Sequence, residues 1–211
     1  MIIRFICGLF AALIVVSGAG AASAQVVNGG FETGMASWTV SGWVSSVTPR
    51  TGSFAADTAC ASATCMNVAG GGSISQTVAT TPGASYTLSF WYRTTNGGDT
   101  PVELQALWSN GAPANGGAGT CTGSCVFGTT TATATYVQVT RTVVATGPTM
   151  QITFLGRNDP AAMLIDDVSL TFLAPPASVP TLTEWAMILF GLVLAGFAAL
   201  TVMRRQSGFG G

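Results

Sequence analysis

The 211-residue chain contains no histidine and no lysine, and only 7% of its residues are charged. Without histidine it cannot form a Ser–His–Asp or Cys–His arrangement, and without lysine it has no Schiff-base nucleophile or Ser–Lys pair. So few cations leave no basic patch for a phosphate backbone, and we expect no nucleic-acid partner. The composition therefore predicts a protein that is not an enzyme.

The acidic residues do not suggest a catalytic pair either. Glycoside hydrolysis needs two carboxylates that face each other across about 5–10 Å. Asp99 lies in an expected turn, and Glu103 has Arg93 as an expected neighbour. Asp166 and Asp167 are adjacent on one expected strand, so their side chains point to opposite faces. No catalytic residue is predicted.

Residues 1–24 are typical of a secretory signal peptide. A positive charge precedes an almost unbroken apolar run from Phe5 to Val16, and Ala22 and Ala24 provide the small residues of a cleavage site before Gln25. We expect export by Sec-type machinery and removal of this segment. An uncleaved N-terminal anchor is the alternative.

A second apolar run, Trp185 to Met203, would form a helix about 28 Å long, close to the hydrocarbon thickness of about 30 Å. Arg204 and Arg205 follow it and are expected to stay on the cytoplasmic side, with Trp185 at the interface. We predict a transmembrane helix over 185–203 that anchors the protein in the lipid bilayer of the inner membrane, with the body of the chain outside.

Residues 179–205 carry a further pattern, because the motif Val-Pro-Thr-Leu-Thr-Glu-Trp precedes the apolar run and two arginines follow it. This order resembles the IPTL-CTERM (exosortase-type) sorting segments of Gram-negative bacteria. The resemblance implies a membrane sorting enzyme of exosortase type and passage of the domain to the cell surface or the extracellular space. A permanent single-pass anchor is the alternative. The expected sorting-motif residues are Val179, Pro180, Thr181, Leu182, Glu184, Trp185, Arg204 and Arg205.

The remaining body, residues 25–173, suits one domain of about 150 residues, and a Pro-rich linker at 174–180 joins it to the helix. It holds four arginines and seven acidic residues, a balance of −3. Short runs with a period of two recur between clusters of Gly, Asn, Pro and Thr, and no run has helical periodicity. We predict an all-β sandwich or jelly roll of about eight strands. The clearest strands are 76–80, 85–94, 101–109, 134–145, 150–156 and 162–172.

Four cysteines of the exported chain lie in two long loops expected at 57–73 and 109–135. Export through an oxidising periplasm favours disulfides over a zinc site, which would also lack histidine. Three connectivities are possible, and local pairing is the simplest because each pair bounds one small loop, stabilising by roughly 2 kcal/mol. The local pairs are Cys60 with Cys65 and Cys121 with Cys125. The loops are either plain surface loops or the rim of a ligand groove.

The alternation of the expected strands places several polar and aromatic side chains away from the core. Trp91 and Arg93 share one face of strand 85–94, and Glu103 and Gln105 share the corresponding face of the next strand. In 38–47 the same reasoning puts Trp38, Val40 and Val44 inward and Trp43 outward. An exposed ring can stack on a sugar while its neighbours bind hydroxyl groups. The predicted ligand-binding residues are Trp43, Trp91, Arg93, Glu103 and Gln105.

The last expected strand places Asp166 on the core face and Asp167 on the outer face. A carboxylate on a core face needs a cation or several N–H partners. The N-terminal stretch Val-Asn-Gly-Gly-Phe-Glu offers Asn28 and Glu32, and oxygen ligands of this kind favour Ca²⁺.

Three stretches, around residues 27–42, 86–94 and 156–170, resemble the galactose-binding-like jelly rolls, which include bacterial carbohydrate-binding modules. The resemblance implies a two-sheet antiparallel jelly-roll sandwich with its N- and C-terminal strands side by side. It also implies a structural Ca²⁺ near the termini, and it leaves open which aspartate binds it. The candidate ligands are Asn28, Glu32, Asp166 and Asp167.

These observations lead to two hypotheses about function. The first is an exported, surface-sorted, non-catalytic module that binds a glycan, with a polysaccharide as its partner, on the aromatic and polar sheet face. The second is a structural or adhesive protein of the cell surface or extracellular matrix, with no small ligand. An open face favours the first hypothesis, and a face buried by loops favours the second.

Overall fold

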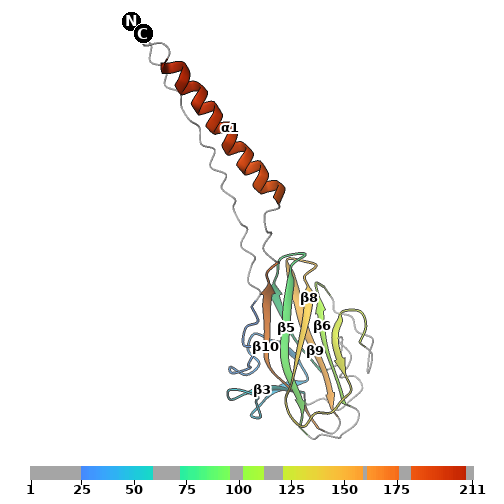
Figure 1. Cartoon of the computed structure of the whole chain (residues 1–211). Coiled ribbons are helices and arrows are strands. Elements are labelled where there is room, and N and C mark those ends of the chain that lie inside the picture. Colours follow the sequence, from blue (N-terminus) through green and yellow to red (C-terminus); the bar gives the residue numbers. More distant parts are fainter. Residues whose placement is uncertain are drawn as a thin grey trace. The chain divides into compact units, whose positions relative to one another are not determined.

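The computed structural model describes residues 25–58, 72–95, 102–111, 121–158, 161–175 and 182–207. It divides into two compact units, the first ending at Leu173 and the second starting at Ala174 (Figure 1). The described strands belong to the first unit, and the second contains one helix, α1 (Leu182–Ser207).

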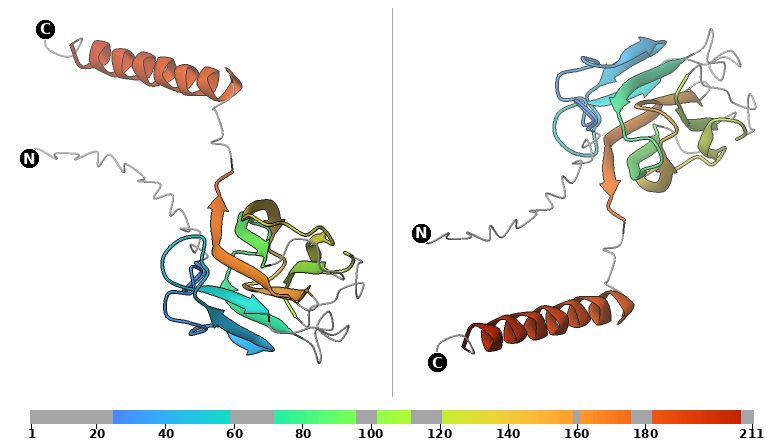
Figure 2. Two further views of the ribbon diagram at one scale, coloured as in Figure 1. Left: turned by 90° about the horizontal axis from the view of Figure 1, so that it is seen from below. Right: turned by 90° about the horizontal axis from the view of Figure 1, so that it is seen from above.

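The first unit is a sandwich of two five-stranded sheets (Figure 1, Figure 2). Sheet A has the order β1-β4-β9-β6-β7, sheet B has the order β2-β3-β10-β5-β8, and neighbouring strands run antiparallel. This architecture confirms the predicted two-sheet antiparallel jelly-roll sandwich. The strands are β1 (Thr39–Ser41), β2 (Trp43–Ser46), β3 (Ala55–Thr58), β4 (Ser73–Ala79), β5 (Ser85–Thr94), β6 (Val102–Ser109), β7 (Cys125–Thr129), β8 (Val137–Val144), β9 (Thr149–Asn158) and β10 (Met163–Leu173).

Strands β5 and β6 follow the alternation that their sequences predict. Alternate residues over 86–92 in β5 and over 102–108 in β6 are buried in one shared core. The ring of Phe90 on β5 lies 4.9 Å, centroid to centroid, from that of Phe154 on β9 in the facing sheet. Burying a side chain of this kind stabilises a fold by about 1.5–3 kcal/mol. The apolar layer between the sheets therefore holds the sandwich together.

The stretch 38–47, expected as one strand, forms two strands that belong to different sheets, β1 in sheet A and β2 in sheet B. Gly42 lies between them with a φ of 69°, a left-handed conformation that glycine adopts without strain. The break reverses the alternation after it, so Trp43 is buried in the core while Val44 is 49% exposed. The predictions that Trp43 faces outward and that Val44 faces inward are therefore wrong. Val40 lies opposite the buried Ile74 and so is on the inward face, as predicted, although it is 38% exposed on the edge strand β1.

Strand β10 contains a bulge between Asp166 and Ser169 that changes which residues face the core. Ile165 before the bulge and Val168 after it both belong to the core, although two residues separate them. The additional residue is Asp167, which has a φ of 49°. Asp166 pairs across the strands with a residue of the outer face of β5, so it lies on the outer face as well, and the prediction that it faces the core is wrong.

Asp166 is nevertheless fully buried, because the segment after β2 covers it. Its Oδ2 accepts hydrogen bonds from the backbone N–H groups of Arg50 (2.7 Å) and Thr51 (3.2 Å), and its Oδ1 accepts one from the N–H of Asp167 (2.7 Å). Burial raises the pKa of Asp166, and the three N–H groups act in the opposite direction. A buried charge persists only where donors of this kind compensate for lost hydration.

The N-terminal turn packs against the same bulge. The N–H of Val168 donates to the carbonyl of Gly29 (2.9 Å), and a Cβ atom on Gly29 would overlap the carbonyl oxygen of Val168, so glycine is required there. The side-chain amide of Asn28 closes the turn by donating to the carbonyls of Gly34 and Ala36. The start of the domain is thereby fastened to its last strand.

Helix α1 contains an apolar stretch, Trp185–Arg204, with a mean hydropathy of 2.4. Its large apolar side chains are exposed, Trp185 to 53%. By length and composition this helix can cross a membrane, at the position where the sequence predicts a span.

Asp166→Ala is expected to lower the free energy of unfolding by about 2–4 kcal/mol, because three N–H groups lose their acceptor. Asp167→Asn is the matched control, since asparagine tolerates the positive φ and the change removes only the charge of a partly exposed ion pair with Arg50, which should cost less than about 1 kcal/mol. Urea unfolding followed by tryptophan fluorescence measures both variants. Equal losses in the two would contradict the structural role of Asp166.

Candidate functional site

The five residues predicted to form one ligand-binding face lie in three places. Trp91 and Arg93 are on β5 in sheet B, whereas Glu103 and Gln105 are on β6 in sheet A. The chain crosses from one sheet to the other between these strands, so the two pairs occupy opposite outer faces of the sandwich. Trp43 is in the core between them. The prediction of one continuous face is therefore wrong, and two separate surfaces replace it.

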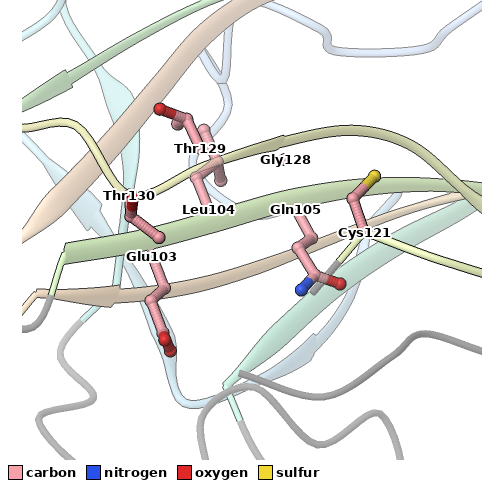
Figure 3. A pocket seen from close by; sticks show the side chains of 7 residues that line it. All are labelled: Glu103, Leu104, Gln105, Cys121, Gly128, Thr129 and Thr130. Carbon is pink, nitrogen blue, oxygen red and sulfur yellow. The ribbon is translucent and has the colours of Figure 1, made fainter. Parts of the chain in front are cut away.

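Glu103 and Gln105 line a hollow of about 150 Å³ on the outer face of sheet A (Figure 3). Their side chains extend from the same side of β6 and are only 8% and 2% exposed. The neighbouring strand β7 and the residues beside it close the hollow, and its remaining lining is Leu104, Cys121, Gly128, Thr129 and Thr130. The sequence predicted a loop over 109–135 and so missed this contribution from β7.

One oxygen of Glu103 has no partner within the described part of the chain. Its Oε2 is buried and accepts no hydrogen bond. Arg157 lies opposite Glu103 in the register of β6 with β9. Because buried polar atoms in proteins are nearly always hydrogen-bonded, this unpartnered carboxylate oxygen is a candidate acceptor for a ligand, which would have to displace the atoms that cover it.

A second hollow of about 150 Å³ lies on the same face at the other end of β6. Its residues Ser109, Gln151 and Thr77 are in register across β6, β9 and β4. Between the two hollows the face carries the buried side chains of Thr153 and Leu155. Among the described residues no aromatic side chain lines either hollow. The alignment of these residues depends on long-range pairing, which leaves no local signal in the sequence.

On the opposite face, Trp91 and Arg93 are each stacked with another side chain. The guanidinium carbon of Arg50 lies 3.7 Å from the centroid of the Trp91 ring, and its Nη1 donates to Asp167 at 2.7 Å. The guanidinium carbon of Arg93 lies 5.3 Å from the ring centroid of Tyr136. A sugar could stack on the covered side of Trp91 only after displacing Arg50.

Two titratable groups near this second face are perturbed by burial. Burial raises the pKa of Asp57 on β3 to about 6, and a hydrogen bond with Ser46 partly offsets the increase. Burial, and then the charge of Asp166, raise the pKa of Tyr136, whose hydroxyl donates to the carbonyl of Thr48 at 2.9 Å. Neither group lines a hollow on sheet A.

The four predicted Ca²⁺ ligands lie near one another, but each already has hydrogen-bond partners. Asn28 uses its side-chain amide within its own turn, and Asp166 accepts three N–H groups. The carboxylate of Glu32 accepts the N–H groups of Ser53 and Phe54, and that of Asp167 accepts hydrogen bonds from Arg50 and from the hydroxyl of Thr51. The described residues contain no group of three or more His, Cys, Asp or Glu side chains suited to a metal. Calcium held by Glu32, Asp167 and neighbouring carbonyl groups stays a prediction.

If Ca²⁺ binds at this position, about 1 mM Ca²⁺ should raise the melting temperature of residues 25–175 above its value in EDTA. This concentration is suitable because extracellular modules bind Ca²⁺ with dissociation constants of about 10⁻⁴–10⁻³ M. Asp167→Asn should abolish the difference, and Asp57→Asn, which lies outside the turn, should preserve it. Differential scanning calorimetry provides the measurement. Identical melting of the wild type in Ca²⁺ and in EDTA would exclude the metal.

Of the predicted disulfide residues, Cys121 and Cys125 are bonded to each other at the start of β7. Cys60 and Cys65 lie outside the described residues. The bonded pair is one of the two local pairs expected from the spacing, and one of its members, Cys121, lines the hollow beside Gln105.

The predicted sorting-motif residues extend from before α1 to its last turn. Val179, Pro180 and Thr181 lie outside the described residues, whereas Leu182, Glu184 and Trp185 occupy the first turn of the helix and Arg204 and Arg205 its last. Residues 177–206 match the IPTL-CTERM motif, which confirms the resemblance of this segment to IPTL-type sorting segments. No curated protein matches the sequence.

Solved structures with a similar fold include carbohydrate-binding modules and an adhesin domain. The N-terminal CBM22-1–CBM22-2 tandem domain of Xyn10C from Paenibacillus barcinonensis is 14% identical, with 74% of this chain and 48% of that chain covered and a TM-score of 0.52. The K3 adhesin domain of Lys-gingipain from Porphyromonas gingivalis w83 is 18% identical, with 71% and 99% covered and a TM-score of 0.50. TmCBM61, solved in complex with β-1,4-galactotriose, is 19% identical, with 70% and 97% covered and a TM-score of 0.46. The first unit therefore has the jelly-roll fold found in carbohydrate-binding modules, and an IPTL-CTERM motif follows it.

Proposed function

We propose that this chain is an exported, non-catalytic carbohydrate-binding module that its C-terminal helix holds outside the inner membrane until a sorting enzyme passes it to the cell surface. The fold supports the first half of the proposal and the IPTL-CTERM motif supports the second. The alternative is a structural or adhesive surface protein that uses the same sandwich without a small ligand, and the burial of Trp43, Glu103 and Gln105 favours it.

The observation that carries the proposal is the hollow beside Glu103 and Gln105. Glu103 provides an acceptor that has no donor among the described residues, and the side chain of Gln105 can both donate and accept hydrogen bonds. Thr129 and Thr130 add hydroxyl groups to the lining. Sugar hydroxyl groups donate and accept hydrogen bonds and so complement such a surface. The hollow is open to solvent along its β7 side, where Thr130 is exposed.

The charge of the domain favours a neutral glycan as the ligand. The body carries a balance of −3, from four arginines and seven acidic residues over 25–173, and the hollow itself contains the carboxylate of Glu103. An acidic sugar would place a second negative charge beside it, which is unfavourable. Neutral oligosaccharides are therefore the first probes.

On an array of neutral oligosaccharides, residues 25–175 are expected to bind, and Glu103→Ala and Gln105→Ala should each weaken binding about tenfold or more, because a hydrogen bond to the ligand is lost. Trp91→Ala, on the opposite sheet, is the matched control and should bind like the wild type. Titration calorimetry on the strongest binder gives the affinities.

The same experiment distinguishes the competing sites and functions. Loss of binding only in Trp91→Ala would move the site to sheet B, where the sequence placed its aromatic residue. A folded wild-type domain that binds no oligosaccharide would refute the module and favour the structural role.

The sorting half of the proposal predicts that a surface form lacks the membrane helix. Replacing Pro180 and Thr181 with alanine should keep the chain in the inner-membrane fraction, because the sorting enzyme would no longer recognise the motif. Thr201→Ala, which leaves the motif intact, is the control. Cell fractionation and mass spectrometry of the surface form provide the test, and a surface form that retains α1 would indicate a permanent anchor.

A further inference from the structure

We propose that the Cys121–Cys125 disulfide is a positioning element of the glycan site, because it holds the loop 121–124, whose Cys121 forms one wall of the hollow beside Gln105. The identity of the ligand rests on the proposed function. The existence of the wall rests on the geometry of β6 and β7, which can be tested without any ligand.

Cys121 occupies a space that β7 leaves free. Gly128 lies directly opposite Gln105 in the register of β6 with β7. A Cβ atom on Gly128 would lie 2.8 Å from Cβ and 3.4 Å from Sγ of Cys121, so any larger residue at this position would displace the cysteine. With glycine there, Cys121 packs over the strand and reaches the hollow beside Gln105 (Figure 3).

The other half of the disulfide is anchored on sheet A. Cys125 lies opposite Leu107 in the same register and packs on Leu107 and Leu155, a small apolar cluster on the outer face. Next to it, the carbonyl of Ser124 accepts a hydrogen bond from the N–H of Trp108 at 2.8 Å. The disulfide therefore ties the exposed Cys121 to an anchor that β6 itself provides.

This arrangement predicts that the disulfide affects binding more than folding. The residues that it fixes are outside the main core between the sheets, and the small cluster under Cys125 belongs to the outer face. Without the bond, residues 121–124 regain freedom that the ligand must then restrict, which weakens binding. The wall is a pre-organised part of the site rather than a support of the sandwich.

Two variants test the proposal on the exported domain, residues 25–175, which has its own core. Cys121→Ala/Cys125→Ala removes the bond, and Gly128→Ala keeps the bond but displaces Cys121. Both variants are expected to bind neutral oligosaccharides on the array about tenfold or more weakly than the wild type. Thr122→Ala, an exposed position within the same loop, is the control and should bind like the wild type.

Hydrogen exchange of the Trp108 amide gives a second readout that needs no ligand. The amide is expected to exchange faster in Cys121→Ala/Cys125→Ala, because Ser124 is no longer held against it, whereas the amides of β5 should keep their protection. If the wild type binds no oligosaccharide, the proposed function fails, and the exchange rate still decides whether the disulfide holds the wall. Unchanged exchange at Trp108, or full binding in both variants, would overturn the proposal.

Discussion

The edge of sheet B and both ends of the jelly roll depend on one buried carboxylate, that of Asp166. It lies where the β10 bulge interrupts regular pairing, and the segment after β2 crosses it with two backbone N–H groups aimed at its Oδ2. Removing one partner of a buried charge is far more costly than losing an exposed ion pair. The segment therefore stays fixed between β2 and β3, which pair with each other from Ser46 opposite Ala55 to the buried Trp43 opposite Thr58.

The crossing of the chain between β5 and β6 decides which surface can receive a ligand. It separates Trp91 from Glu103 by the full thickness of the sandwich, so one ligand cannot contact both the ring of Trp91 and the side chains of Glu103 and Gln105. Arg50 covers the ring of Trp91, whereas the outer face of sheet A keeps two hollows. Recognition on this face would rest on hydrogen bonds from polar side chains in register, among which Glu103 has an oxygen with no donor in the part of the chain that the structure describes.

The sequence predicts the regular parts of this fold well, because alternation in β5 and β6 directly reports which side chains meet the core. It fails where one residue interrupts the pattern: Gly42 divides a stretch between two sheets, and Asp167 adds a residue to β10. That Glu103 and Gln105 lie on the outer face of β6 could be predicted from the alternation of side chains along the strand alone. The residues that complete their hollow could not, since β7 reads as part of a Thr- and Gly-rich loop and its register with β6 is set by contacts distant in sequence.

The path from the domain to its anchor has a mechanical consequence. Strand β10 lies in the middle of sheet B, pairs with β5 from Met163 to Leu173, and leads at Leu173 into the segment before α1. A pull on the segment that follows Leu173 would therefore reach the domain through a strand that is paired on both sides. The hydrogen bonds between β10 and β5 would carry this load in parallel and would have to break together, whereas a tether attached to an edge strand could open them one at a time.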